Sequence, residues 1–104
     1  MLTTAKSGDT QAFAAAKTAW YRNGDDIARF LASANPNNWP LADMQAAMNT
    51  HLDTTLAEAV ARLNGDWNAD VAAYDAVNQH ILHMADTLSD GIIAQFPAAF
   101  AKAK

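Results

Sequence analysis

Residues that interrupt helices are confined to four short stretches of this sequence, and their positions restrict the fold more than any other feature. The stretches are Gly8-Asp9, Asn35–Pro40, Asn64–Asp66 and Phe96-Pro97. Because glycine and proline commonly end helices, each segment between these stretches can form one helix of several turns. The spacing predicts three long helices, at about residues 10–34, 40–63 and 66–95.

The composition favours helix over strand in all three segments. The 104 residues include 25 alanines and only three valines; alanine is the best helix former, whereas β-branched residues prefer strands. A chain of this length builds one modest core. We therefore expect an all-α antiparallel bundle of three long helices, in a single domain spanning 1–104 with frayed or partly ordered ends at 1–9 and 97–104.

Each predicted helix carries large apolar residues at helical spacing, and such a stripe normally faces a core. In the first helix the stripe is Phe13, Trp20, Ile27 and Ala34. In the second helix it is Leu41, Met44, Met48, Leu52, Leu56, Ala59 and Leu63. In the third helix it is Trp67, Val71, Tyr74, Val77, Ile81, Met84, Leu88 and Ile92.

Charge and cysteine content exclude several classes of function. Seven basic residues stand against eleven acidic ones, and this net charge of −4 argues against nucleic-acid binding. The absence of cysteine excludes disulfide scaffolds, iron–sulfur clusters, thiolate zinc sites and cysteine nucleophiles. No apolar run is long enough for membrane insertion, and no signal peptide is visible. We expect a cytoplasmic chain by default, or an exported one if it is cut from a secreted parent.

Two turns of the chain share one pattern, in which a helix end is followed by glycine and then by an Asp that can cap the next helix. They are residues 6–10 (KSGDT) and 63–67 (LNGDW). If the match reflects a repeat, Met1–Lys6 is the end of an earlier helix that this chain lacks.

Six segments of the chain carry a family resemblance: residues 20–31 (WYRNGDDIARFL), 35–40 (NPNNWP), 51–55 (HLDTT), 66–75 (DWNADVAAYD), 81–86 (ILHMAD) and 91–97 (GIIAQFP). Together they resemble part of a family of small, uncharacterised bacterial helical proteins, which are often automatically labelled "glycosyltransferase" or "acetylglutamate kinase". Longer members look internally duplicated, and this chain resembles their C-terminal half. The resemblance implies a helical fold and supplies no catalytic residues. It also implies an uncovered apolar surface, which a second copy of the chain could cover in a homodimer.

Neither automatic label is supported by the residues. The sequence contains no glycine-rich phosphate loop and no strand–turn–helix nucleotide unit. The serines Ser7, Ser33 and Ser89 each lie near a predicted helix end with no histidine close in sequence. We therefore expect no enzymatic activity.

All three histidines fall in one predicted layer between the second and third helices. Around the turn at Asn64-Gly65, residues at equal distance from the turn lie at the same height, so His51 should face His80. The candidate ligands of this layer are His51, His80, His83, Met48 and Met84. Imidazole and thioether groups suit copper or haem iron, and imidazole also suits zinc. The alternative is that the methionines fill the core and the histidines are rim residues.

Two further groups of charged residues have structural interpretations. Glu58 and Arg62 should lie level with Asp66, Asp70 and Tyr74, in a buried network that fixes the register of the two helices. Ferritin-like di-metal chemistry is disfavoured, because Glu58 is the only glutamate and no Glu-x-x-His motif occurs. Asp25-Asp26 between Arg22 and Arg29 should form ion pairs on a solvated face.

The sequence leaves two classes of function open. The first is a non-enzymatic scaffold or interaction domain that associates with itself, as a homodimer or higher oligomer. The second is a bundle that binds copper, zinc or haem in the histidine–methionine layer.

Overall fold

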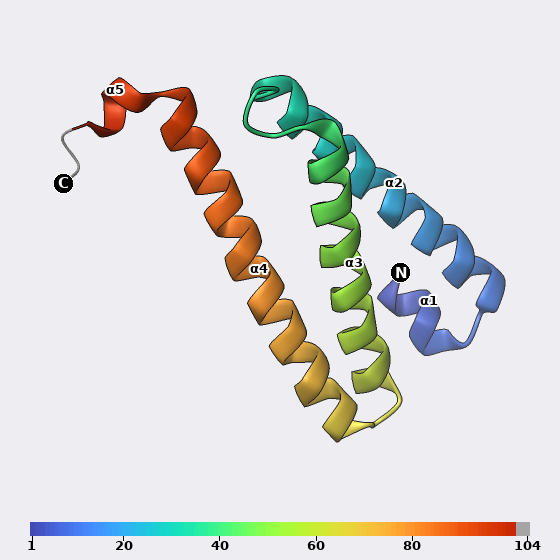
Figure 1. Ribbon diagram of the computed structural model, residues 1–104. Coiled ribbons are helices and arrows are strands. Elements are labelled where there is room, and N and C mark those ends of the chain that lie inside the picture. The colour runs from blue at the N-terminus through green and yellow to red at the C-terminus, as the bar shows by residue number, and fades with distance from the viewer. Residues whose placement is uncertain (102–104) are drawn as a thin grey trace.

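The computed structural model describes residues 1–101, which are almost entirely helical and contain no strand (Figure 1). The helices are α1 (Leu2–Ser7), α2 (Thr10–Ala34), α3 (Leu41–Leu63), α4 (Trp67–Gln95) and α5 (Pro97–Phe100). The all-α fold and the three long helices are confirmed, with bounds within one residue of those predicted. The frayed end expected over 97–104 includes residues 102–104, which lie outside the described residues.

The two glycine turns explain where α2 and α4 begin. Gly8 and Gly65 both adopt the left-handed conformation, with φ angles of 77° and 70°, which a residue without a Cβ adopts at little cost. The side chain of Asp9 then accepts a hydrogen bond from the Ala12 amide at 3.0 Å. Asp66 accepts one from the Ala69 amide at 3.1 Å. The predicted pattern of glycine turn and Asp cap is therefore confirmed at both places.

The long helices are arranged as an open layer, with α3 in the middle and α2 and α4 on either side of it (Figure 1). The short helix α1 folds back against α2. The described fold is elongated, with extents of 52 × 28 × 18 Å. Its radius of gyration of 16.8 Å exceeds the value of about 13 Å expected for a compact domain of this length.

The connection between α2 and α3 also holds the far end of α4. Asn35, at 1% exposure, donates from Nδ2 to the Gly91 carbonyl at 2.9 Å and accepts a hydrogen bond from Asn38 at 3.0 Å. The buried indole of Trp39 donates to the Thr87 carbonyl at 3.3 Å and covers Gly91. We call this contact of Asn35 and Trp39 with α4 the loop clamp. Trp39 thus anchors the connecting loop on α4.

The core is small and rich in methionine. Its central cluster contains Ala28, Trp39, Met44, Met48 and Met84. These residues come from α2, α3, α4 and the connecting loop. Methionine fills irregular space between helices without the fixed shape of a branched side chain.

The predicted core-facing stripes of α2 and α4 are only partly correct. On α2, Gly24 and Ala28 are buried, while Ile27 and Ala34 are exposed. These small residues permit close packing of α2 on α3. On α4, Met84 is buried, but most of the large residues of the predicted stripe are exposed. The face of α4 that packs on α3 is therefore not the most apolar one.

Candidate functional site

The predicted pairing of His51 with His80 is confirmed. The two imidazole rings, one from α3 and one from α4, are stacked with centroids 6.2 Å apart and an interplanar angle of 24°. The antiparallel register set by the turn at Asn64-Gly65 places them at the same height.

The hydrogen bonds of the two rings differ. Nε2 of His80 lies 3.0 Å from the carbonyl oxygen of Ala47, and because a carbonyl only accepts, this nitrogen carries the ring proton. Nδ1 of His51 is buried and has no hydrogen-bond partner among residues 1–101. Leaving a buried polar atom without a hydrogen-bond partner typically costs about 1–3 kcal/mol of stability. Among the side chains of residues 1–101, this nitrogen is the buried polar atom in that position.

The other candidate ligands do not converge on this pair. His83 is exposed, and with His80 and Met84 it lines a shallow groove between α3 and α4. The methyl end of Met48 lies against Gly24 of α2, on the other side of α3. Within residues 1–101, no three side chains of His, Asp or Glu are grouped closely enough to hold a metal ion.

The expected buried network near the α3–α4 turn is wrong in its burial. Arg62 does pair with Asp70, Nη1 to Oδ2 at 3.2 Å, but the Arg62 side chain is largely exposed. Its guanidinium lies over the Trp67 ring, 5.2 Å from the centroid. Tyr74 is exposed. The cluster is therefore open to solvent on the Arg62 side, and exposed ion pairs of this kind contribute little stability.

Polar contacts between α2 and α3 were not predicted from the sequence. The Tyr21 hydroxyl donates to the Asp53 carboxylate. Partial burial, this hydrogen bond and the negative charge of Asp53 raise the pKa of Tyr21 to about 12. To predict this pair, one would need to know how α2 and α3 are aligned along each other. The irregular loop that joins them leaves this alignment unspecified in the sequence.

A second contact links α2 and α3 through Asp25. Its carboxylate accepts from Arg29 Nε at 2.8 Å, as the sequence predicted, and from Gln45 Nε2 at 2.7 Å. Hydrogen bonds from Arg29 and then Gln45 hold the pKa of Asp25 below its usual value. The hydrogen bond from Gln45 thereby links this ion pair of α2 to α3.

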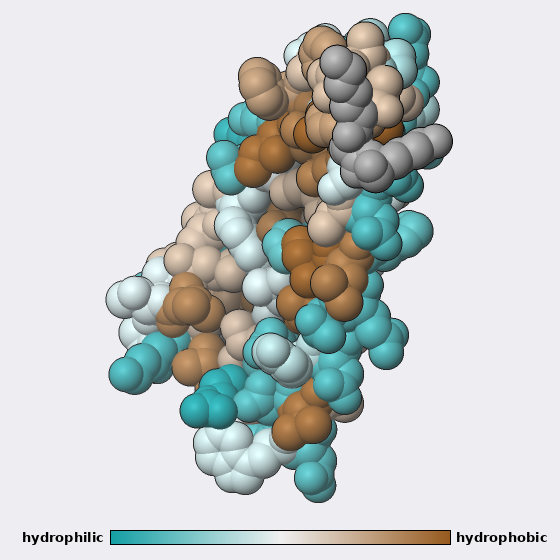
Figure 2. Space-filling view, turned by 90° about the vertical axis from the view of Figure 1, so that its left-hand side faces the viewer, coloured by the Kyte–Doolittle hydropathy of each residue, from teal (hydrophilic) through white to brown (hydrophobic). Residues whose placement is uncertain are grey.

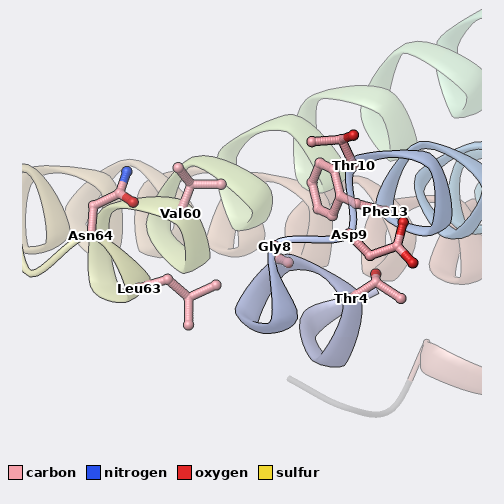
Figure 3. Close-up of a pocket in the computed structure, with 9 residues that line it drawn as sticks. Thr4, Gly8, Asp9, Thr10, Phe13, Val60, Leu63 and Asn64 are labelled. Carbon is pink, nitrogen blue, oxygen red and sulfur yellow. The ribbon is translucent and has the colours of Figure 1, made fainter.

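A hollow of about 210 Å³ lies where α1 turns into α2 (Figure 3). Phe13, Val60 and Leu63 supply its apolar lining, and Gly8 and Asp9 its turn. The Asp9 carboxylate is already engaged in capping α2. The hollow thus offers mainly apolar contact.

The most extensive unexplained feature is a row of residues along α4 at alternating steps of three and four, which we call the α4 seam. Its members are Trp67, Val71, Tyr74, Asn78, Ile81, Ala85, Leu88 and Ile92. Leu88 is half-buried and the others are exposed, with exposed fractions of 60% for Trp67, 63% for Val71 and 58% for Tyr74. Figure 2, seen from the side on which α4 lies in Figure 1, shows several apolar patches along this side of the molecule.

Comparisons of this chain with protein-family models, curated proteins and solved structures return no match. Within residues 1–101, no helix combines the length and the apolar character needed to cross a membrane. The interpretation of the site therefore depends on its geometry.

Proposed function

We propose that this chain is a non-enzymatic helical scaffold that assembles with copies of itself. The observation that carries the proposal is the α4 seam, which contains no charged residue and whose large apolar members, apart from the half-buried Leu88, are exposed. Groups of exposed apolar residues along one face often mark interaction sites in soluble proteins, whereas single exposed apolar residues do not.

The surface area of the chain supports the same proposal. Its accessible surface is 6991 Å², whereas a compact monomer of 11.1 kDa exposes about 5,700 Å². The excess of about 1,300 Å² is larger than the roughly 800 Å² that each partner buries in a standard protein interface. One copy of the chain thus leaves enough surface open for a stable dimer.

The experiment is sedimentation velocity at micromolar concentrations on the chain and on two matched variants. Ile81→Glu puts a charge into the α4 seam, and Gln79→Glu puts the same charge onto an exposed position two residues away. We expect the chain and Gln79→Glu to form a dimer or higher oligomer, and Ile81→Glu to sediment as a monomer with unchanged helicity. A monomeric parent chain would contradict the proposal.

A second candidate function, metal or haem binding, is favoured by the buried Nδ1 of His51 beside the His80 ring. A ligand at this atom would relieve the cost of leaving it without a partner. Copper, zinc and haem iron all accept imidazole ligands. Met84 lines a groove together with His80, whereas Met48 lies on the α2 side of α3.

Native mass spectrometry of the purified chain tests this second candidate, before and after addition of copper, zinc or haem. Binding at the pair predicts one added mass per chain, lost in the His51→Ala/His80→Ala double variant and retained in the His83→Ala control. A bare chain in every mixture would rule the site out.

A further inference from the structure

Residues of α4 fall into three sets that point in different directions. The set that packs on α3 is Asp70, Ala73, Val77, His80, Met84, Thr87 and Gly91, all buried or half-buried. The exposed polar set includes Gln79, His83, Asp86 and Asp90. The third set is the α4 seam. At about 100° per residue the three sets lie roughly a third of a turn apart.

The set that packs on α3 is less apolar than the α4 seam. The set facing α3 contains an aspartate, a histidine, a threonine and a glycine, whereas the α4 seam holds most of the large apolar residues of the helix. A helix that is apolar on more than one side belongs inside an assembly with neighbours on both sides. Within residues 1–101, α4 has one extended neighbour, α3.

Steps of three and four residues are the repeat by which two helices pack in a coiled coil. In that repeat Val71, Asn78, Ala85 and Ile92 occupy one core position, and Trp67, Tyr74, Ile81 and Leu88 occupy the other. The α4 seam therefore has the pattern of a helix that pairs with another long helix. The α4 seam of a second copy of the chain has the same length and is equally free of charge, so it is a suitable partner.

We infer that two copies of the chain pair through their α4 seams, with the two α4 helices antiparallel and Tyr74 packed on Ala85 of the partner subunit. This inference rests on the proposed self-association and names the surface and geometry that perform it. A two-fold axis near the middle of α4 then makes the contact self-complementary.

Side-chain size favours the antiparallel direction. With Tyr74 opposite Ala85 of the partner subunit, a large residue fills the space left by a small one, and Val71 falls opposite Leu88 of the partner subunit. A parallel pair would instead place Tyr74 against its own copy and Ala85 against its own copy. One layer would be overpacked and the other would contain a cavity, and both defects destabilise a core.

Disulfide trapping tests both the surface and the direction, since the chain has no cysteine of its own. Tyr74→Cys and Ala85→Cys are oxidised separately and after mixing. In the antiparallel dimer the mixed sample cross-links. The single variants do not, because like positions are about 16 Å apart along the axis, beyond the reach of a disulfide. Val71→Cys with Leu88→Cys is a second pair, and Gln79→Cys is the control on the polar face.

The outcomes separate this inference from the proposed function. Cross-linking in both mixed samples, with none in the control, is the expected result. Cross-linking of each single variant alone would overturn the antiparallel direction. A dimer by sedimentation that cross-links in none of the pairs would overturn the seam as its surface while leaving self-association intact. A monomer by sedimentation would overturn both.

Discussion

The indole of Trp39 lies directly over Gly91, so closely that a Cβ built on Gly91 would be 2.0 Å from the indole Nε1. Gly91 is buried on α4, 52 residues away in sequence, and its φ angle is an ordinary helical one that any residue could adopt. The glycine is thus required by the space that Trp39 occupies and not by the backbone conformation.

We predict that Gly91→Ala destabilises the fold by about 2 kcal/mol or more, because the rigid indole must move to admit a methyl group. The free energy of unfolding from urea titration measures the loss. The tryptophan emission should also shift, because Trp39 becomes more exposed. A variant as stable as the parent chain would mean that the indole is not held over Gly91.

Gly24→Ala is the matched comparison, and we expect it to cost much less. A Cβ at Gly24 would be 2.6 Å from Leu52 Cδ1, the end of a flexible side chain that can change its rotamer. Replacing a helical glycine by alanine also gains about 1 kcal/mol of helix propensity. The same urea titration should rank this variant above Gly91→Ala in stability; the reverse order would refute the explanation.

Removal of the Asn35 side chain should weaken the loop clamp. Asn35→Ala removes the hydrogen bond to the Gly91 carbonyl and the acceptor for Asn38, so we expect a loss of about 1–3 kcal/mol. Asn37→Ala, at an exposed position in the same loop, is the control and should change stability little. Thermal unfolding followed by circular dichroism compares the two; equal midpoints would contradict the prediction.

The Tyr21–Asp53 contact predicts a loss of stability in alkali. The folded state raises the pKa of Tyr21 from 10.0 to about 12, so folding favours the neutral phenol. This contribution is fully present below pH 10 and is lost as the pH rises toward about 12. Tyr21→Phe should show a smaller alkaline loss. Absorbance titration of the Tyr74→Phe variant, in which Tyr21 is the remaining tyrosine, reads its pKa directly.

The Asp25 cluster predicts the opposite dependence, in acid. Because its pKa is lowered from 3.8 in the folded state, the carboxylate contributes stability above that value, and the contribution disappears as the pH falls through the lowered pKa. Asp25→Asn should lose stability at neutral pH and converge on the parent chain in acid. Urea titrations across the acid range check this, and a constant difference between the two would argue against it.

The helices could be predicted from the sequence because their signals are local. Asp9 and Asp66 follow glycines that end the preceding helix, and proline or asparagine interrupts the other boundaries. The loop clamp could not be predicted, because nothing near Gly91 in sequence records that Trp39 covers it. The predicted α4 stripe is correct only in part: Val77, Met84 and Leu88 are buried or half-buried, whereas its other members are exposed. Helical spacing identifies the stripe but not which edge of it meets α3.

In the histidine layer, too, the sequence predicts one part of the arrangement and not the other. Counting residues from the turn at Asn64-Gly65 was enough to place His51 beside His80. The direction of a flexible side chain is not set by that count. Met48 turns toward Gly24, into the space which that glycine leaves on α2, and only the packing of a third helix determines this.

The loop clamp also bears on the order in which this chain folds. Each helical hairpin forms from neighbouring residues, and the hydrogen bond from Asn35 to Gly91 spans 56 positions. Contacts between residues that are distant in sequence have a larger entropy cost of loop closure. The local hairpins therefore form first, and the distant contact follows. Docking of Trp39 should therefore be the last event of folding, and indole fluorescence should lag behind helicity in a stopped-flow experiment.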